Sequence, residues 1–115
     1  MSKIDGTLNN LNYIKRNLLK MIISISYDLK SPGRNYDALY TAIKSANSWS
    51  HPMESLWFIN TSESIEVWNS KLRQVIDQND TLFLVDITGQ QRHGWMFQDV
   101  WDWLNNHNQA HTFSF

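Results

Sequence analysis

The stretch that decides the fold is Met21–Tyr36, which reads MIISISYDLKSPGRNY. Its first half alternates Ile23, Ile25 and Tyr27 with two serines. This period of two is typical of a β-strand with one buried face. The strand pattern ends at Asp28, and the Ser-Pro-Gly sequence soon after it breaks a strand. A carboxylate at a strand end, beside a tight loop, indicates either a ligand site or an aspartate that organises the loop.

The rest of the chain alternates helix and strand patterns. Stripes of apolar side chains at helical spacing predict helices, whereas alternating, β-branched or aromatic runs predict strands. The expected elements are a helix capped by Asn35 and ending near Asn47, strands over Ser48–Ser50 and Glu54–Thr61 around a turn at His51 and Pro52, a helix capped by Thr61 or Ser62 and ending near Asp77, a strand over Thr81–Ile87 and a last helix over Trp95–Asn106.

This order of elements predicts an α+β protein with a ferredoxin-like βαββαβ fold. In that fold, two helices cover one face of a four-stranded antiparallel sheet. We expect residues 1–20 to form an N-terminal amphipathic helical arm, because Leu8, Leu11 and Leu18 recur at helical spacing. Residues 21–115 would form the ferredoxin-fold domain, including the tryptophan-rich C-terminal helix.

The same topology predicts where polar side chains meet. The end of the first strand, the turn between the second and third strands, and the start of the fourth strand lie at one end of such a sheet. The residues that we expect there, although far apart in sequence, are Asp28, Arg34, His51, Glu54 and Asp80.

The fourth strand carries apolar residues on both of its faces. Leu82 and Leu84 alternate with Phe83, Val85 and Ile87, so the second face of the sheet must also be covered. The N-terminal helix, the C-terminal segment or another copy of the chain could supply that cover. We expect a homodimer, because a large apolar patch is rare on the surface of a monomer.

Composition and charge narrow the classes of function. The chain has 115 residues, no cysteine and a formal net charge of −1, which predicts one domain without thiol chemistry or global attraction to nucleic acid. It contains no apolar run that could cross a bilayer and no secretory signal pattern. We therefore expect a cytoplasmic protein that does not associate with membranes.

From Met21 to about Gly89 the chain also resembles the CRISPR-associated Cas2 superfamily, and most closely the small bacterial Cas2-like proteins that are labelled SinR-like. The residues that carry this resemblance are ISISYDL ending at Leu29, ESLWF from Glu54, NDTLFLV from Asn79 and WDWL near the end. In Cas2 proteins an aspartate after the first strand is paired across a dimer. It is implicated in metal-dependent nuclease activity in some members, whereas other members are integration scaffolds.

We expect functional roles for four residues. The role of Asp28 is implied by the resemblance, whereas those of Asp80, Lys30 and Arg34 follow from the chemistry of carboxylates and cations. Asp28 matches the Cas2 aspartate and would be the catalytic residue and a ligand for Mg²⁺ or Mn²⁺. A second ligand would come from Asp80 or from the dimer-related Asp28. Lys30 and Arg34 would contact the phosphates of RNA or DNA. The alternative is that both aspartates organise turns.

Two functional hypotheses follow. The first is a Cas2-like, nucleic-acid-associated homodimer, with a weak metal-dependent endonuclease or endoribonuclease activity at Asp28. The second is a non-enzymatic interaction module, such as an antitoxin, immunity or accessory factor, that holds a protein partner through the sheet face or the C-terminal aromatic residues. The near-neutral charge favours the second hypothesis.

Overall fold

The computed structural model describes residues 20–107, and the predicted arm of residues 1–20 lies outside this range except for its last residue. The elements in chain order are β1 (Met21–Asp28), α2 (Asp37–Lys44), β2 (Ser48–Met53), β3 (Leu56–Thr61), α3 (Ile65–Arg73), β4 (Thr81–Asp86) and α4 (Gln98–Asn106). The protein is therefore α+β, as predicted.

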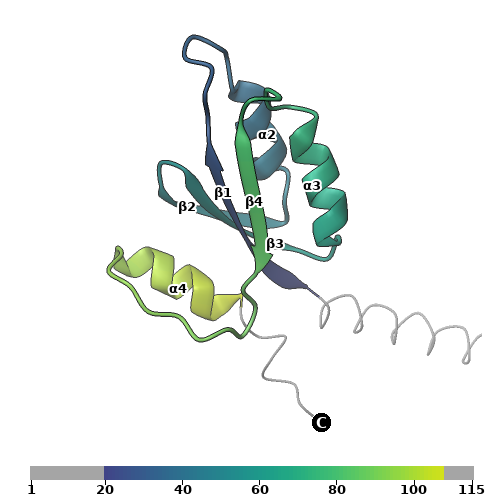
Figure 1. Ribbon diagram of the computed structural model, residues 1–115. Coiled ribbons are helices and arrows are strands. Elements are labelled where there is room, and N and C mark those ends of the chain that lie inside the picture. Colours follow the sequence, from purple (N-terminus) through teal and green to yellow (C-terminus); the bar gives the residue numbers. More distant parts are fainter. Residues whose placement is uncertain (1–19, 108–115) are drawn as a thin grey trace, which may run out of the picture.

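The four strands form one antiparallel sheet in the order β2-β3-β1-β4 (Figure 1). The central strand β1 fixes the register, because Ile25 lies opposite Trp57 of β3 and Leu84 of β4. The helices α2 and α3 lie together on one face of this sheet (Figure 1). The edges are formed by β2 and β4. No helix within residues 20–107 is long and apolar enough to cross a membrane.

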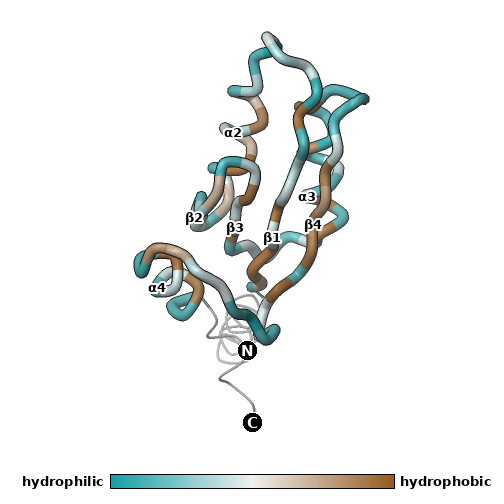
Figure 2. Tube along the Cα trace, turned by 60° about the vertical axis from the view of Figure 1, so that its left-hand side comes forward, coloured by the Kyte–Doolittle hydropathy of each residue, from teal (hydrophilic) through white to brown (hydrophobic). Residues whose placement is uncertain are grey.

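The main hydrophobic core lies between the sheet and these two helices. Alternate residues of β1 point into this core, as the period of two predicts. Leu39 of α2 and Trp68 of α3 pack against them from the helix side. Figure 2 shows the hydrophobic segments that run along β1 and β4. The fully buried members of this core are Ile23, Ile25, Leu39, Ile43, Ile59, Trp68 and Leu72.

A second, smaller core lies on the opposite face of the sheet. Val100 and Leu104 of α4 pack there against Ile22 and Phe58. The indole Nε1 of Trp103 donates a hydrogen bond to Ser48 Oγ at 2.9 Å, which fixes α4 to the edge strand β2. The C-terminal tryptophan-rich segment is therefore one of the covers of the second face.

Several element boundaries differ from the prediction, and two of the differences have clear physical reasons. The predicted turn at His51 and Pro52 is wrong, since both residues belong to β2. Proline is tolerated there because β2 is an edge strand and its pairing with β3 shifts between Ser50 and Met53. The cap of α3 is Ser64, whose Oγ accepts a hydrogen bond from the backbone N–H of Val67 at 3.2 Å.

Candidate functional site

Three segments meet at one end of the sheet. Asp28, the last residue of β1, lies opposite Thr81, the first residue of β4. The backbone N–H of Tyr27 donates to the carbonyl oxygen of Ser55 at 3.2 Å, so the β2–β3 turn reaches the same end. The structure thus brings together segments that are about 25 to 50 residues apart in sequence.

Asp80 organises the loop at this end. Its Oδ1 accepts hydrogen bonds from the backbone N–H of Lys30 at 2.7 Å and from the Tyr36 hydroxyl at 2.9 Å. Its Oδ2 accepts from the backbone N–H of Asp77 at 2.7 Å. Burial acts to raise the pKa of Asp80, but these hydrogen bonds and the charge of Arg34 outweigh it and lower the pKa below its ordinary value.

Asp28 is exposed and forms an ion pair within its own loop. Its Oδ2 lies 2.7 Å from the Nζ of Lys30, and 64% of its side chain is exposed. The hydrogen bond and the charge of Asp28 raise the pKa of Lys30. Such exposed pairs contribute little to stability. The Lys30 ammonium nevertheless takes the position beside Asp28 that a metal ion or a phosphate contact would need.

Arg34 is also paired with an acid of this region. Its Nη1 lies 3.5 Å from Asp77 Oδ2, and its guanidinium lies over the ring of Tyr36 at 5.6 Å. Both cations that we expected to bind phosphates therefore already face a carboxylate. A nucleic acid would have to compete with these carboxylates for Lys30 and Arg34.

His51 and Glu54 form contacts within the β2–β3 hairpin. The imidazole of His51 stacks on Trp57 with ring centroids 3.6 Å apart, and its Nε2 lies 3.1 Å from the carbonyl oxygen of Glu54. The same carbonyl accepts the Tyr27 hydroxyl at 3.1 Å, and that hydroxyl accepts Trp57 Nε1 at 2.9 Å. Burial raises the pKa of Tyr27, so its hydroxyl stays protonated. The sequence pattern missed this network.

The donor set at this end fits a divalent cation poorly. Residues 20–107 contain no group of three or more His, Cys, Asp or Glu side chains placed to hold a metal ion. Three hydrogen bonds engage the carboxylate of Asp80, and Lys30 neutralises Asp28. Mg²⁺ and Mn²⁺ prefer oxygen ligands with free lone pairs, so this loop would have to rearrange to bind either ion.

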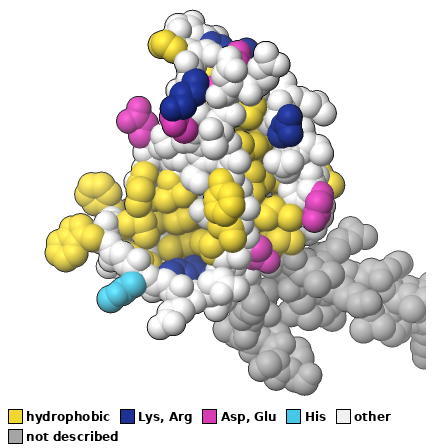
Figure 3. Space-filling view, in the orientation of Figure 1, with side chains coloured by type: hydrophobic (Ala, Val, Ile, Leu, Met, Phe, Trp, Pro, Cys, Tyr) yellow, Lys and Arg dark blue, Asp and Glu magenta, His cyan; other side chains and the backbone are white. Residues whose placement is uncertain are grey.

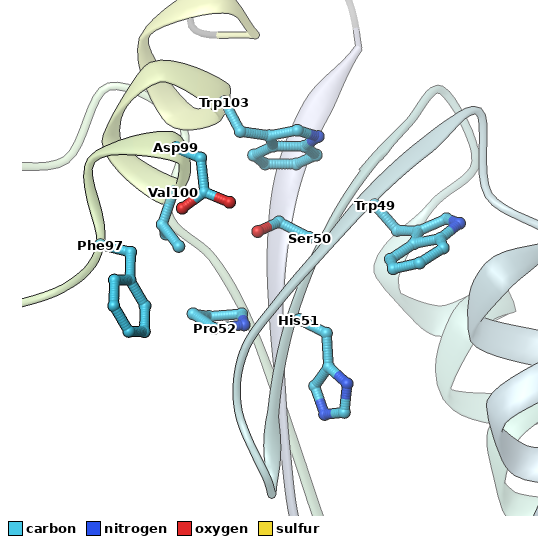
Figure 4. Close-up of a pocket in the computed structure, with 8 residues that line it drawn as sticks. All are labelled: Trp49, Ser50, His51, Pro52, Phe97, Asp99, Val100 and Trp103. Atoms are coloured by element: carbon cyan, nitrogen blue, oxygen red, sulfur yellow. The ribbon is translucent and has the colours of Figure 1, made fainter.

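A second feature lies away from this loop, on the other face of the sheet. Phe83 and Val85 of β4 are 63% and 39% exposed although they lie within a strand. A separate cleft of about 520 Å³ lies between β2 and α4 (Figure 4). Only the clustered tryptophans of the sequence signalled it, because the cleft depends on where α4 docks.

Comparison with protein-family models, curated proteins and solved structures finds no match to this chain. The resemblance to Cas2 proteins therefore remains a prediction.

Proposed function

We propose that this protein is a non-enzymatic interaction module with a ferredoxin-like fold that works as a homodimer. Its two copies would meet through the second face of the sheet at β4. The observation that carries this proposal is the exposure of Phe83 and Val85, two large apolar side chains on one face of an edge strand. Apolar patches of this kind mark interaction surfaces.

The strand order supports the ferredoxin-like part of the proposal. Because β1 and β2 each run antiparallel to β3, they are parallel to each other with β3 between them. The helix α2 connects these two strands, which makes a split βαβ unit. The segment β3, α3 and β4 makes a second such unit around β1.

The register explains why the β4 half of the second face is open. Ser24 lies opposite Val85, and Ser26 lies opposite Phe83, so all four side chains share that face. Because the side chains of Ser24 and Ser26 are small, they cover little of the larger apolar side chains of Val85 and Phe83 opposite them. Helix α4 covers this face around Ile22 of β1 and Phe58 of β3. Figure 3 shows the hydrophobic surface on this side of the molecule.

The internal pairing at the β1 end supports a non-enzymatic role. Asp80 holds the loop through three hydrogen bonds, while Asp28 and Arg34 each have an oppositely charged partner. Catalytic acids and bases usually lie in a cleft that a substrate can enter. Here the carboxylates and cations bind one another within the loop.

The test is the molar mass in solution, measured by light scattering during size-exclusion chromatography. We expect wild type to elute at about twice the 13.6 kDa of one chain. Phe83→Ser should elute as a monomer. The matched control is Val67→Ser, because Val67 is 42% exposed but lies on α3, which covers the opposite face of the sheet from Phe83. A monomeric wild type, or a dimeric Phe83→Ser protein, would contradict the proposal.

A second candidate function is a Cas2-like, nucleic-acid-associated protein with weak metal-dependent endonuclease activity. The exposure of Asp28 at a strand end favours it, since an exposed carboxylate can reach a phosphodiester. In this candidate Asp28, with Asp80 or a second copy of Asp28, would hold Mg²⁺ or Mn²⁺. Lys30 and Arg34 would contact phosphates after leaving their present partners.

Cleavage of labelled RNA and DNA with Mg²⁺ or Mn²⁺ tests this candidate. If it is correct, wild type cleaves, and both chelator and Asp28→Asn reduce the rate at least about 100-fold, because the metal would lose its ligand. Asp102→Asn on α4 is the matched control and should cleave like wild type. Our proposal of a non-enzymatic module predicts no cleavage above background by any of these proteins.

A further inference from the structure

The cleft between β2 and α4 runs along the open edge of the sheet. Successive side chains of a strand point to opposite faces. Yet Trp49 and His51 line this cleft together with Ser50 and Pro52. Figure 4 shows the first pair on one side of β2 and the second pair on the other. Because β2 is the terminal strand of the sheet, the cleft lies beside an open strand edge.

That edge can accept another strand. In the sheet order β2 is the terminal strand, and among the described residues it pairs only with β3. An edge strand presents backbone N–H and C=O groups outward, and these bind extended peptides by strand addition. Pro52 and the register shift after Ser50 disturb the later half of β2. The usable edge is therefore Ser48–His51.

The α4 side of the cleft combines aromatic and aliphatic walls with one carboxylate. Phe97, Val100 and Trp103 supply the apolar surface, and 82% of Phe97 is exposed. Asp99 directs its carboxylate into the space between α4 and β2 (Figure 4). Within residues 20–107 no lysine or arginine forms an ion pair with Asp99. This wall suits a cationic side chain.

The α2 side of β2 disfavours a cationic side chain. The Nζ of Lys44 lies 5.2 Å from the ring centroid of Trp49, on the face that carries α2. A second cation there would be repelled by Lys44. A bound strand should therefore place lysine or arginine on the α4 side and uncharged residues on the α2 side. Alternate residues of one extended peptide meet both demands.

We propose that the cleft binds an extended peptide segment that adds as a strand to Ser48–His51 and inserts a lysine or arginine side chain beside Asp99. This inference rests on the proposed interaction function and names the class of segment that the module holds. Backbone hydrogen bonds along β2 would supply part of the affinity, and the cationic residue would set the register.

The probe is an end-blocked peptide of sequence Thr-Val-Thr-Lys-Thr-Val-Thr, titrated into ¹⁵N-labelled full-length protein and followed by NMR. Saturable shifts of the backbone amides of Ser48–His51 are expected. Replacing the central lysine by glutamate, or methylating the alternate peptide amides that face β2, should weaken binding at least about tenfold, because each change removes a charge pair or backbone hydrogen bonds.

Two variants of the protein localise the effect. Asp99→Asn should weaken binding of the lysine peptide about five- to tenfold and leave the glutamate peptide unaffected or bound more tightly. Asp102→Asn is the matched control, since Asp102 lies on the same helix, accepts a hydrogen bond from Gln98 Nε2 and does not line the cleft. It should bind like wild type.

Three results of the peptide titrations would overturn the inference: no shifts at millimolar peptide, equal binding of the lysine and glutamate peptides, or equal binding after backbone methylation. Shifts of the same amides on dilution without peptide would assign the edge to a second copy and also overturn it. Phe83→Ser should bind the peptide like wild type. A failed peptide titration in a dimeric protein therefore rejects this inference alone, and a monomeric wild type rejects only the homodimer.

Discussion

At the scale of single residues, the carboxylate of Asp80 orders the loop that follows β1. Its position before β4 predicted a turn residue or a metal ligand, and the structure gives it hydrogen bonds from Lys30, Tyr36 and Asp77. Two of these donors precede Asp80 by more than 40 positions, as the separations of 50 and 44 residues indicate. No local pattern contains that information, because it depends on β1 and β4 being neighbours.

Replacing Asp80 by asparagine should therefore lower the free energy of unfolding. The amide keeps one acceptor but turns an N–H₂ group toward the backbone N–H of Asp77, so we expect a loss of about 1–3 kcal/mol at pH 7. Urea unfolding measures it, with Asp102→Asn as the control expected to change stability by less than about 0.5 kcal/mol. Equal stability of the Asp80 variant and wild type would show that the loop needs no charged organiser.

The pH dependence of the same variant has a defined sign. Because the folded-state pKa of Asp80 lies below its ordinary value of 3.8, the contribution of the ionised carboxylate is complete above that value. It is lost as the pH falls further, through the lower folded-state pKa. The stability difference between wild type and Asp80→Asn should be full at pH 7 and narrow below about pH 4. A difference that grows on acidification would contradict this assignment.

At the scale of elements, the type of each described strand and helix followed from hydrophobic periodicity, whereas several ends did not. The helix α2 begins at Asp37 with Tyr36 as its N-cap, one residue later than a cap at Asn35 implies, because Asn35 Oδ1 accepts the N–H of Asp37 in a turn before the helix. Thr61 ends β3, as predicted, but does not cap α3, because its Oγ1 accepts Trp68 Nε1 at 2.9 Å inside the core.

The start of α3 offers a direct comparison of two serines. Ser64→Ala removes the acceptor for the N–H of Val67 and should cost about 1 kcal/mol. Ser62, one of the two caps that the pattern predicted, is exposed and lies before the helix. Ser62→Ala should therefore leave the unfolding free energy within about 0.5 kcal/mol of wild type. The reverse ranking in urea unfolding would place the cap at Ser62.

At the scale of the whole molecule, the two faces of the sheet are covered to different extents. One face is closed by α2 and α3 over a continuous core, and the other is only half closed by α4. The sequence predicted that β4 is apolar on both faces. The structure agrees, because Leu82 and Leu84 face the main core while Phe83 and Val85 are exposed on the other face. The sequence did not predict that α4 would cover the β2 and β3 half, since helix docking depends on long-range contacts such as Trp103 with Ser48.

The measurement that tests the central claim most directly is an isotope-filtered NOE experiment on a mixture of ¹³C-labelled and unlabelled full-length chains. We predict intermolecular NOEs from the Phe83 ring to protons of β1 and β4 on the second face, and none from the methyl groups of Val67. If Phe83 gave no intermolecular NOE in a protein that sediments as a monomer, the sheet face would not be an interface between copies, and the proposed homodimeric module would be refuted.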